Sequence, residues 1–170
     1  MLLALDPGVH LGYARLPGGE LGVLVLPQDP EEAVRRMVEG LRPLLLTSDR
    51  IVVEGWQVRG KRPGRHTLVP VALIGALVAL GSHVVPPTWK RAFAPRVPLT
   101  HFAGLSFPSG LDPTDRGIWL RLHLDGYGPL LKDIQMLPKR YRPHALDALG
   151  LARYSLLHGI KEGMDHARAV

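Results

Sequence analysis

The feature that most constrains the fold of this chain is a pair of short apolar segments, each ending in an acidic residue. The segment Met1–Asp6 is apolar up to its last residue, and Arg50–Glu54 has a β-branched centre that leads directly to its glutamate. Short apolar runs without a polar face are typical of strands that are buried on both sides of a sheet. We therefore predict that these two segments are central strands.

Between the two central strands, the chain predicts a hairpin followed by a helix. Segments Gly12–Leu16 and Leu21–Leu26 have strand character, and the Pro17-Gly18-Gly19 sequence between them is a strong turn signal. Asp29 then precedes Pro30 and two glutamates, a pattern that is typical of a helix N-terminus. Apolar residues follow at helical spacing up to residue 45.

After the second central strand, the sequence predicts alternating helices and strands. The expected elements are a buried helix, a short strand and two later helices, over Leu68–Leu80, Ser82–Val85, Thr114–Leu124 and His144–Leu157 respectively. Strand–helix–strand crossovers produce parallel neighbours, so the two central strands should lie side by side. We predict a single α/β domain with a mixed sheet and helices on both faces. Its expected limits are residues 1–160, with a variable region at 94–140 and a tail at 161–170.

Composition excludes several classes of protein. Apolar residues make up 46% of the chain and charged residues 21%, as in a soluble globular protein. No cysteine is present, which excludes disulfides, iron–sulfur clusters and thiol catalysis. No apolar run is long enough to span a bilayer and no basic leader precedes the first one, so we expect a cytoplasmic protein without a membrane partner. The net charge of +6 favours a polyanionic partner.

Four residues from distant parts of the sequence are expected to meet at one edge of the sheet. Asp6 and Glu54 end neighbouring parallel strands, whose carboxyl ends point the same way. His144 and Asp147 are three residues apart and therefore share one face of the last helix. Clustered acids raise one another's pKa unless a cation neutralises them, and oxygen-rich sites select Mg²⁺ or Mn²⁺. We therefore predict a metal-dependent nuclease whose catalytic and metal-binding residues are these four.

Each of these residues also has an ordinary structural explanation. An aspartate before Pro-Gly commonly initiates a turn, and a glutamate at a strand end is commonly solvated. His144 follows Pro143 and could simply begin a helix. Asp147 is harder to explain in this way, because an acid within an apolar helical stretch needs a partner or a path to solvent.

Basic and aromatic residues near Glu54 are candidate DNA contacts. Four cations fall within seven residues of a glycine-containing loop, where the backbone can approach a phosphate closely; they are Arg59, Lys61, Arg62 and Arg65. Trp56 could stack on an exposed base, or it could be a half-buried packing residue. Lys90 and Arg91 are further candidate DNA contacts.

Four segments together resemble the RuvC family of Holliday-junction resolvases, within the RNase H-like nuclease superfamily. The segment from Leu5 to Ala14 resembles the family's opening Asp-Pro-Gly…Gly-Tyr motif, and residues 51–54 resemble its second motif. The segment Pro87–Lys90 is similar to its proline…lysine segment, and His144–Ala152 resembles its closing helix. The resemblance covers residues 1–93 and 140–158.

The resemblance implies an RNase H-like fold, with a five-stranded mixed sheet in the order 3-2-1-4-5. It implies that Asp6, Glu54, His144 and Asp147 hold two Mg²⁺ ions, for which Mn²⁺ would substitute. It also implies a homodimer that cuts opposed strands of a four-way DNA junction, leaving 5′-phosphate and 3′-hydroxyl ends, with a branch-migration helicase as a possible partner. An aromatic residue after the glutamate stacks on a junction base in this family, and Trp56 is the candidate here.

The chain also departs from the family pattern. The stretch from Lys90 to His144 is longer than in the family, and only Arg116 and Lys132 are available for the family's second basic residue. These departures favour a divergent or phage-type member. The alternatives are another RNase H-like nuclease that acts on hybrids or single strands, a non-catalytic nucleic-acid-binding module, and, as the weakest, an actin-like ATPase.

Overall fold

The computed structural model describes residues 1–56, 65–97 and 106–159 of the chain. The strands within these ranges are β1 (Leu2–Asp6), β2 (His10–Leu16), β3 (Leu21–Val25), β4 (Arg50–Glu54) and β5 (His83–Val85). The helices are α1 (Pro30–Thr47), α2 (Arg65–Ala79), α3 (Trp89–Phe93), α4 (Pro113–Leu124), α5 (Gly128–Met136) and α6 (Arg142–His158).

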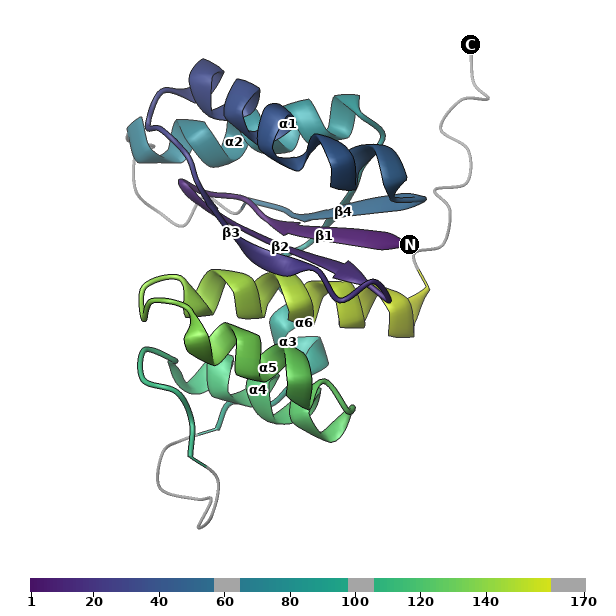
Figure 1. Ribbon diagram of the computed structural model, residues 1–170, viewed down its shortest axis with the longest axis vertical. Helices are drawn as coiled ribbons and strands as arrows, with labels where there is room; N and C mark the ends of the chain where they lie inside the picture. The colour runs from purple at the N-terminus through teal and green to yellow at the C-terminus, as the bar shows by residue number, and fades with distance from the viewer. Residues whose placement is uncertain (57–64, 98–105, 160–170) are drawn as a thin grey trace.

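The strands form one mixed sheet in the order β3-β2-β1-β4-β5 (Figure 1). Strands β1, β2 and β3 are joined by antiparallel pairing, whereas β1 with β4 and β4 with β5 are parallel. Both predicted central strands therefore lie in the middle of the sheet, side by side. The predicted fold class and strand order are confirmed.

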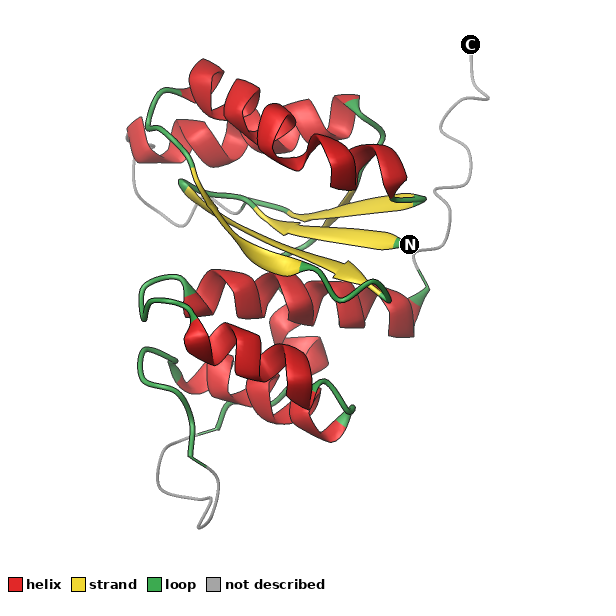
Figure 2. Cartoon of the chain, in the orientation of Figure 1, coloured by secondary structure: helices red, strands yellow, loops and turns green. Residues whose placement is uncertain are grey.

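Helices cover both faces of the sheet, as Figure 2 shows. Helices α1 and α2 cover one face, and their core contains Met37, Leu41 and Leu73. Helix α6 lies against the other face, with α3, α4 and α5 packed beyond it. Asp29 caps α1 as predicted, because its side chain accepts a hydrogen bond from the Glu32 N–H at 2.9 Å. No helix in the described ranges is both long enough and apolar enough to cross a bilayer.

Three element boundaries differ from the sequence prediction. Strand β2 begins at His10, two residues early, because His10 pairs with Val25 of β3. Helix α2 begins at Arg65, so Pro70 lies inside the helix and not in its first turn. Helices α3 and α5 were not predicted: α3 is only five residues long, and α5 begins at a glycine followed by proline, a combination that more often marks a turn.

Residues 94–140 contain α4 and α5, which pack on α6. Arg116 of α4 is buried, and its guanidinium donates hydrogen bonds to the carbonyl oxygens of Val97 and Leu111 at 2.9 Å each. It therefore joins the chain on either side of α4 and lies away from the predicted site. Lys132 is exposed on α5. That residues 94–140 are a variable insertion stays a prediction, and the predicted tail at 161–170 lies outside the described residues.

Candidate metal centre and nucleic-acid interface

Asp6 and Glu54 stand at the carboxyl ends of the two central parallel strands. In the register between β1 and β4, Leu5 pairs with Val53, so the acidic residue that follows each of them emerges at the same edge of the sheet. Glu54 is buried and Asp6 is partly buried. The paired strands thus place two carboxylates together, as the sequence predicted.

Asp147 reaches this edge because the start of α6 packs very closely on β2. A Cβ atom built on Gly12 of β2 would lie 2.0 Å from the carbonyl oxygen of His144 in α6. Only glycine permits that approach, since any side chain would collide with helix backbone. The contact holds the first turns of α6 against the sheet and directs Asp147 towards the strand ends.

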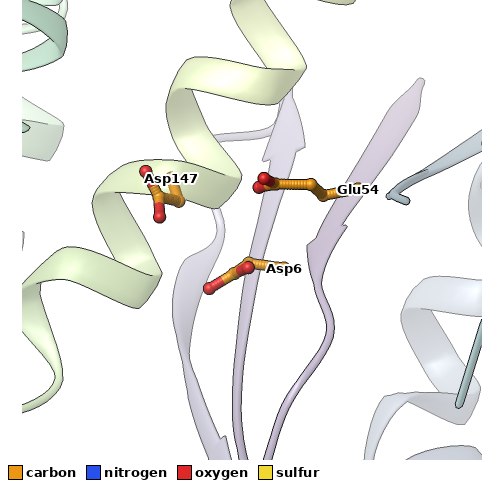
Figure 3. Close-up of side chains that lie close together, drawn as sticks. All are labelled: Asp6, Glu54 and Asp147. Atoms are coloured by element: carbon orange, nitrogen blue, oxygen red, sulfur yellow. The ribbon is translucent and has the colours of Figure 1, made fainter. Parts of the chain in front are cut away.

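The three carboxylates converge, as Figure 3 shows. One oxygen from each of Asp6, Glu54 and Asp147 lies within 4.8 Å of the other two. These residues line a cavity of about 440 Å³ that is open to solvent, which we call the acidic cavity. Its other lining residues are Pro7, Gly8, Val9, His10, Gly55, Trp56, Pro70, Lys90, Pro143 and His144.

Lys90 of α3 lies inside this cluster. Its Nζ is 2.5 Å from Oδ2 of Asp147 and 3.6 Å from Oε2 of Glu54. Burial by itself would lower the pKa of Lys90, but the charges of Asp147 and Glu54 outweigh it and raise that pKa. The lysine is therefore a cation held among three acids. The sequence suggested Lys90 as a DNA contact, and the structure places it beside the predicted metal ligands.

The carboxylates remain incompletely neutralised. Burial raises the pKa of Glu54, and it raises the pKa of Asp147 well above its usual range, while Lys90 opposes both shifts. Oε2 of Glu54 and Oδ1 of Asp147 are buried and have no hydrogen-bond partner among the described residues. Buried polar atoms without partners are rare in folded proteins and call for an explanation at the site.

A divalent cation supplies that explanation, because the donor set fits one. Three carboxylates against one ammonium leave excess negative charge, and the two oxygens without partners are available as ligands. Oxygen donors of this kind suit Mg²⁺ or Mn²⁺ in preference to zinc. The residues present therefore fit the metal that the sequence predicted.

His144 lies at the rim of the carboxylate cluster and contacts one member of it. Its Nδ1 is 2.9 Å from Oδ2 of Asp6, so all four residues predicted from sequence lie at one site. Sequence reasoning missed His10, whose ring packs edge-on against those of His144 and Tyr141, with centroids 5.5 and 5.2 Å apart. Burial, together with the nearby His144 and Arg140, lowers the pKa of His10. The early start of β2 is what brings His10 to the cavity.

The remaining predicted DNA contacts are only partly described. Trp56 is 43% exposed and lines the acidic cavity, which suits a stacking surface better than a packing residue. Arg91 is exposed on α3, one residue beyond Lys90. Arg65 begins α2. The other three basic residues, Arg59, Lys61 and Arg62, lie outside the described residues.

Comparison of the structure with solved structures gives the clearest likeness to known proteins. Thermus thermophilus RuvC in complex with a Holliday junction substrate matches with a TM-score of 0.57 and 15% sequence identity, covering 93% of this chain and 96% of that one. The chain has a RuvC-like fold. A second structure, of Thermus thermophilus RuvC, matches with a TM-score of 0.52, 17% identity and the same coverage.

The RuvC-like fold is visible in structure but not by sequence comparison. No protein-family model matches the chain, and no curated protein matches it either. Identity at this level shows the fold alone. The chemistry must therefore be argued from the residues of the acidic cavity.

Proposed function

We propose that this chain is a metal-dependent endonuclease that hydrolyses phosphodiester bonds at four-way DNA junctions. The observation that carries the proposal is the convergence of Asp6, Glu54 and Asp147 at the carboxyl edge of a RuvC-like sheet. Supporting it are the two buried carboxylate oxygens without partners and the net charge of +6, which suits a nucleic-acid substrate.

Asp6, Glu54, Asp147 and His144 are the residues that would hold two Mg²⁺ ions, with Mn²⁺ as a substitute. When bound, such ions activate a water for attack and stabilise the departing oxygen of the phosphodiester. The proposed products are a 5′-phosphate and a 3′-hydroxyl end. Asp6 already engages Nδ1 of His144, which fixes the imidazole and leaves Nε2 as its other ring nitrogen.

Lys90 is placed to act on the substrate phosphate. With a divalent cation taking over the charge of Asp147 and Glu54, the ammonium is no longer needed between them. Its side chain is long and lines the cavity, so it can turn towards a phosphate oxygen. Trp56, on the same wall, offers an exposed ring on which a base could stack.

We further propose that two copies of the chain associate through α2, so that each copy cuts one of two opposed strands. The inner side of α2 is buried in the core, yet its outer side is also apolar, with Leu68, Val71 and Val78 each about half exposed. Gly75 lies on the same outer side, and no atom would come within 4 Å of a Cβ built there, so another helix could approach closely. An aspartate in place of Val71 should convert a dimer to a monomer, as measured by light scattering. A wild-type monomer at micromolar concentration would contradict this.

The proposed setting is DNA recombination or repair in the cytoplasm, with a branch-migration helicase as a candidate partner. A motor that moves the junction would supply the branched DNA that the enzyme cuts.

The test is cleavage of four labelled substrates, with and without Mg²⁺ or Mn²⁺. We expect metal-dependent nicking of a four-way junction, and little cleavage of duplex, RNA–DNA hybrid or single strand. The variant Asp6→Asn should bind the junction but not cut it. Cleavage of the hybrid or single strand instead would indicate another RNase H-like nuclease. Binding without any metal-dependent cleavage would indicate a non-catalytic module.

A further inference from the structure

A second cavity lies next to the acidic cavity and shares Lys90 with it. This second cavity has a volume of about 390 Å³, and we call it the basic cavity. It is lined by Pro87, Lys90, Arg91, Ala94, Arg96, Asp112, Thr114 and Asp115. Because Lys90 lines both cavities, a strand that occupies one passes directly beside the other.

The arginines of the basic cavity are not used by the fold. Arg91 and Arg96 are both exposed, and neither has a hydrogen bond or an ion pair within residues 1–56, 65–97 and 106–159. By contrast, Arg116, a few residues away, is buried and fully engaged with backbone carbonyl oxygens. Arginines that stabilise this region are therefore recognisable by their partners, and Arg91 and Arg96 lack such partners.

The acidic residues of the basic cavity are accounted for by the start of α4. Oδ1 of Asp112 accepts hydrogen bonds from the N–H groups of Thr114 and Asp115, at 2.6 and 2.9 Å. Oδ2 of Asp115 accepts the N–H of Asp112 at 3.1 Å, which completes a capping box. These carboxylates are held by backbone donors, and they form no ion pair with Arg91 or Arg96 in the described residues.

We propose that the basic cavity binds a phosphate of the cut strand next to the scissile phosphate, with Arg91 and Arg96 as its ligands. This inference rests on the proposed function, because the acidic cavity must hold the scissile phosphate. Guanidinium groups suit a phosphate because they offer several donors in one plane. Lys90, between the two cavities, is placed to contact the chain from either side. Arg91 and Arg96 thus set the register in which a strand enters the acidic cavity.

The test compares a double variant, Arg91→Ala with Arg96→Ala, with a matched control that also removes two arginines. The control is Arg42→Ala with Arg50→Ala, since both residues are exposed and lie towards the edge of the sheet opposite the acidic cavity. Binding to the four-way junction is measured against salt concentration in Ca²⁺, in an Asp6→Asn background so that no cleavage occurs. Losing one phosphate contact should reduce the slope of log affinity against log salt by about 1 and weaken binding about tenfold at moderate salt.

Replacing single phosphates of the cut strand by neutral methylphosphonates locates the contact. With the arginines present, neutralisation at one position beside the scissile phosphate should weaken binding about tenfold. In the double variant, the same neutralisation should have no further effect. An equal loss in both backgrounds, or a slope identical to that of the control, would overturn the proposal and leave the nuclease assignment intact. Junction binding that loses a phosphate contact as expected, in a protein that cannot cleave any substrate, would overturn the nuclease assignment alone. A chain that binds no DNA overturns both.

Discussion

Asp147 and Asp125 are two aspartates of nearly equal exposure, each paired with a cation, yet the structure treats them in opposite ways. Their side chains are 11% and 13% exposed. Asp125, at the end of α4, accepts hydrogen bonds on both oxygens, from Arg121 at 3.1 Å and from Arg153 of α6 at 2.8 Å. Asp147 shares a single lysine with Glu54 and leaves Oδ1 without a partner.

The pKa values follow this difference. Burial alone would raise the pKa of Asp125, but the two arginines outweigh it and lower that pKa. For Asp147, burial and the neighbouring carboxylates outweigh Lys90, and the pKa rises. An acid that serves the fold is given enough donors for both oxygens. An acid that awaits a cation is left short of them, at a cost in stability that binding can recover.

The largest expected effect separates the two aspartates by activity. Asp147→Asn should lower metal-dependent junction cleavage at least about a thousandfold, because several kcal/mol of transition-state stabilisation by the metal site is lost. Asp125→Asn should leave cleavage unchanged but lower the free energy of unfolding by about 1–2 kcal/mol, because charge-assisted hydrogen bonds are lost. Single-turnover cleavage and urea denaturation measure the two quantities. Equal loss of activity in both variants would remove the distinction.

Removing the cation should expose the difference more directly. In the metal-free protein, Lys90→Met leaves Asp147 and Glu54 uncompensated and should lower the free energy of unfolding by roughly 3 kcal/mol. The same variant should bind Mg²⁺ or Mn²⁺ about tenfold more tightly or better, since no ammonium competes for the carboxylates. Calorimetric titration without DNA measures the metal affinity. Weaker metal binding would show that Lys90 supports the metal site instead of occupying it.

The smallest effect is a divergence in pH dependence. Because the folded-state pKa values of Asp147 and Glu54 are raised, folding retains protons that the unfolded chain releases. The stability they contribute is therefore present at low pH and lost as pH rises above the unfolded value of about 4. Asp125 has a lowered pKa, so its contribution is present above that value and lost as pH falls below it.

Melting temperatures in EDTA from about pH 3 to pH 8 would test this divergence. The stability gained by Asp147→Asn over wild type should grow with pH, whereas the deficit of Asp125→Asn should shrink at the acid end. Saturating Mg²⁺ should remove the first trend and leave the second. Parallel curves for the two variants would contradict the assignment of opposite pKa shifts.

Much of the site could be predicted from sequence because its framework is set by local patterns. The apolar segments before Asp6 and Glu54 identify buried strands, and parallel pairing then fixes which edge both acids share. The spacing of His144 and Asp147 places them on one helical face, whatever the rest of the fold does.

The parts that escaped prediction depend on tertiary packing. Helix α3 is only five residues long, and nothing in its own pattern reveals that Lys90 turns towards Asp147. His10 enters the cavity because pairing with β3 extends β2 by two residues. The arginine pair on Asp125 joins the end of α4 to α6, a contact between residues 28 positions apart that no periodicity predicts.

The near-contact between Gly12 and the His144 carbonyl has a wider consequence. The spacing between the two walls of the catalytic centre is determined by a hydrogen atom, at a residue that takes no part in the chemistry. A single added methyl group would keep every ligand in the sequence and still move the wall that carries two of them. Inspection of ligands alone would pass such a variant as intact, so the glycine must be included whenever relatives of this chain are sorted into active and inactive forms.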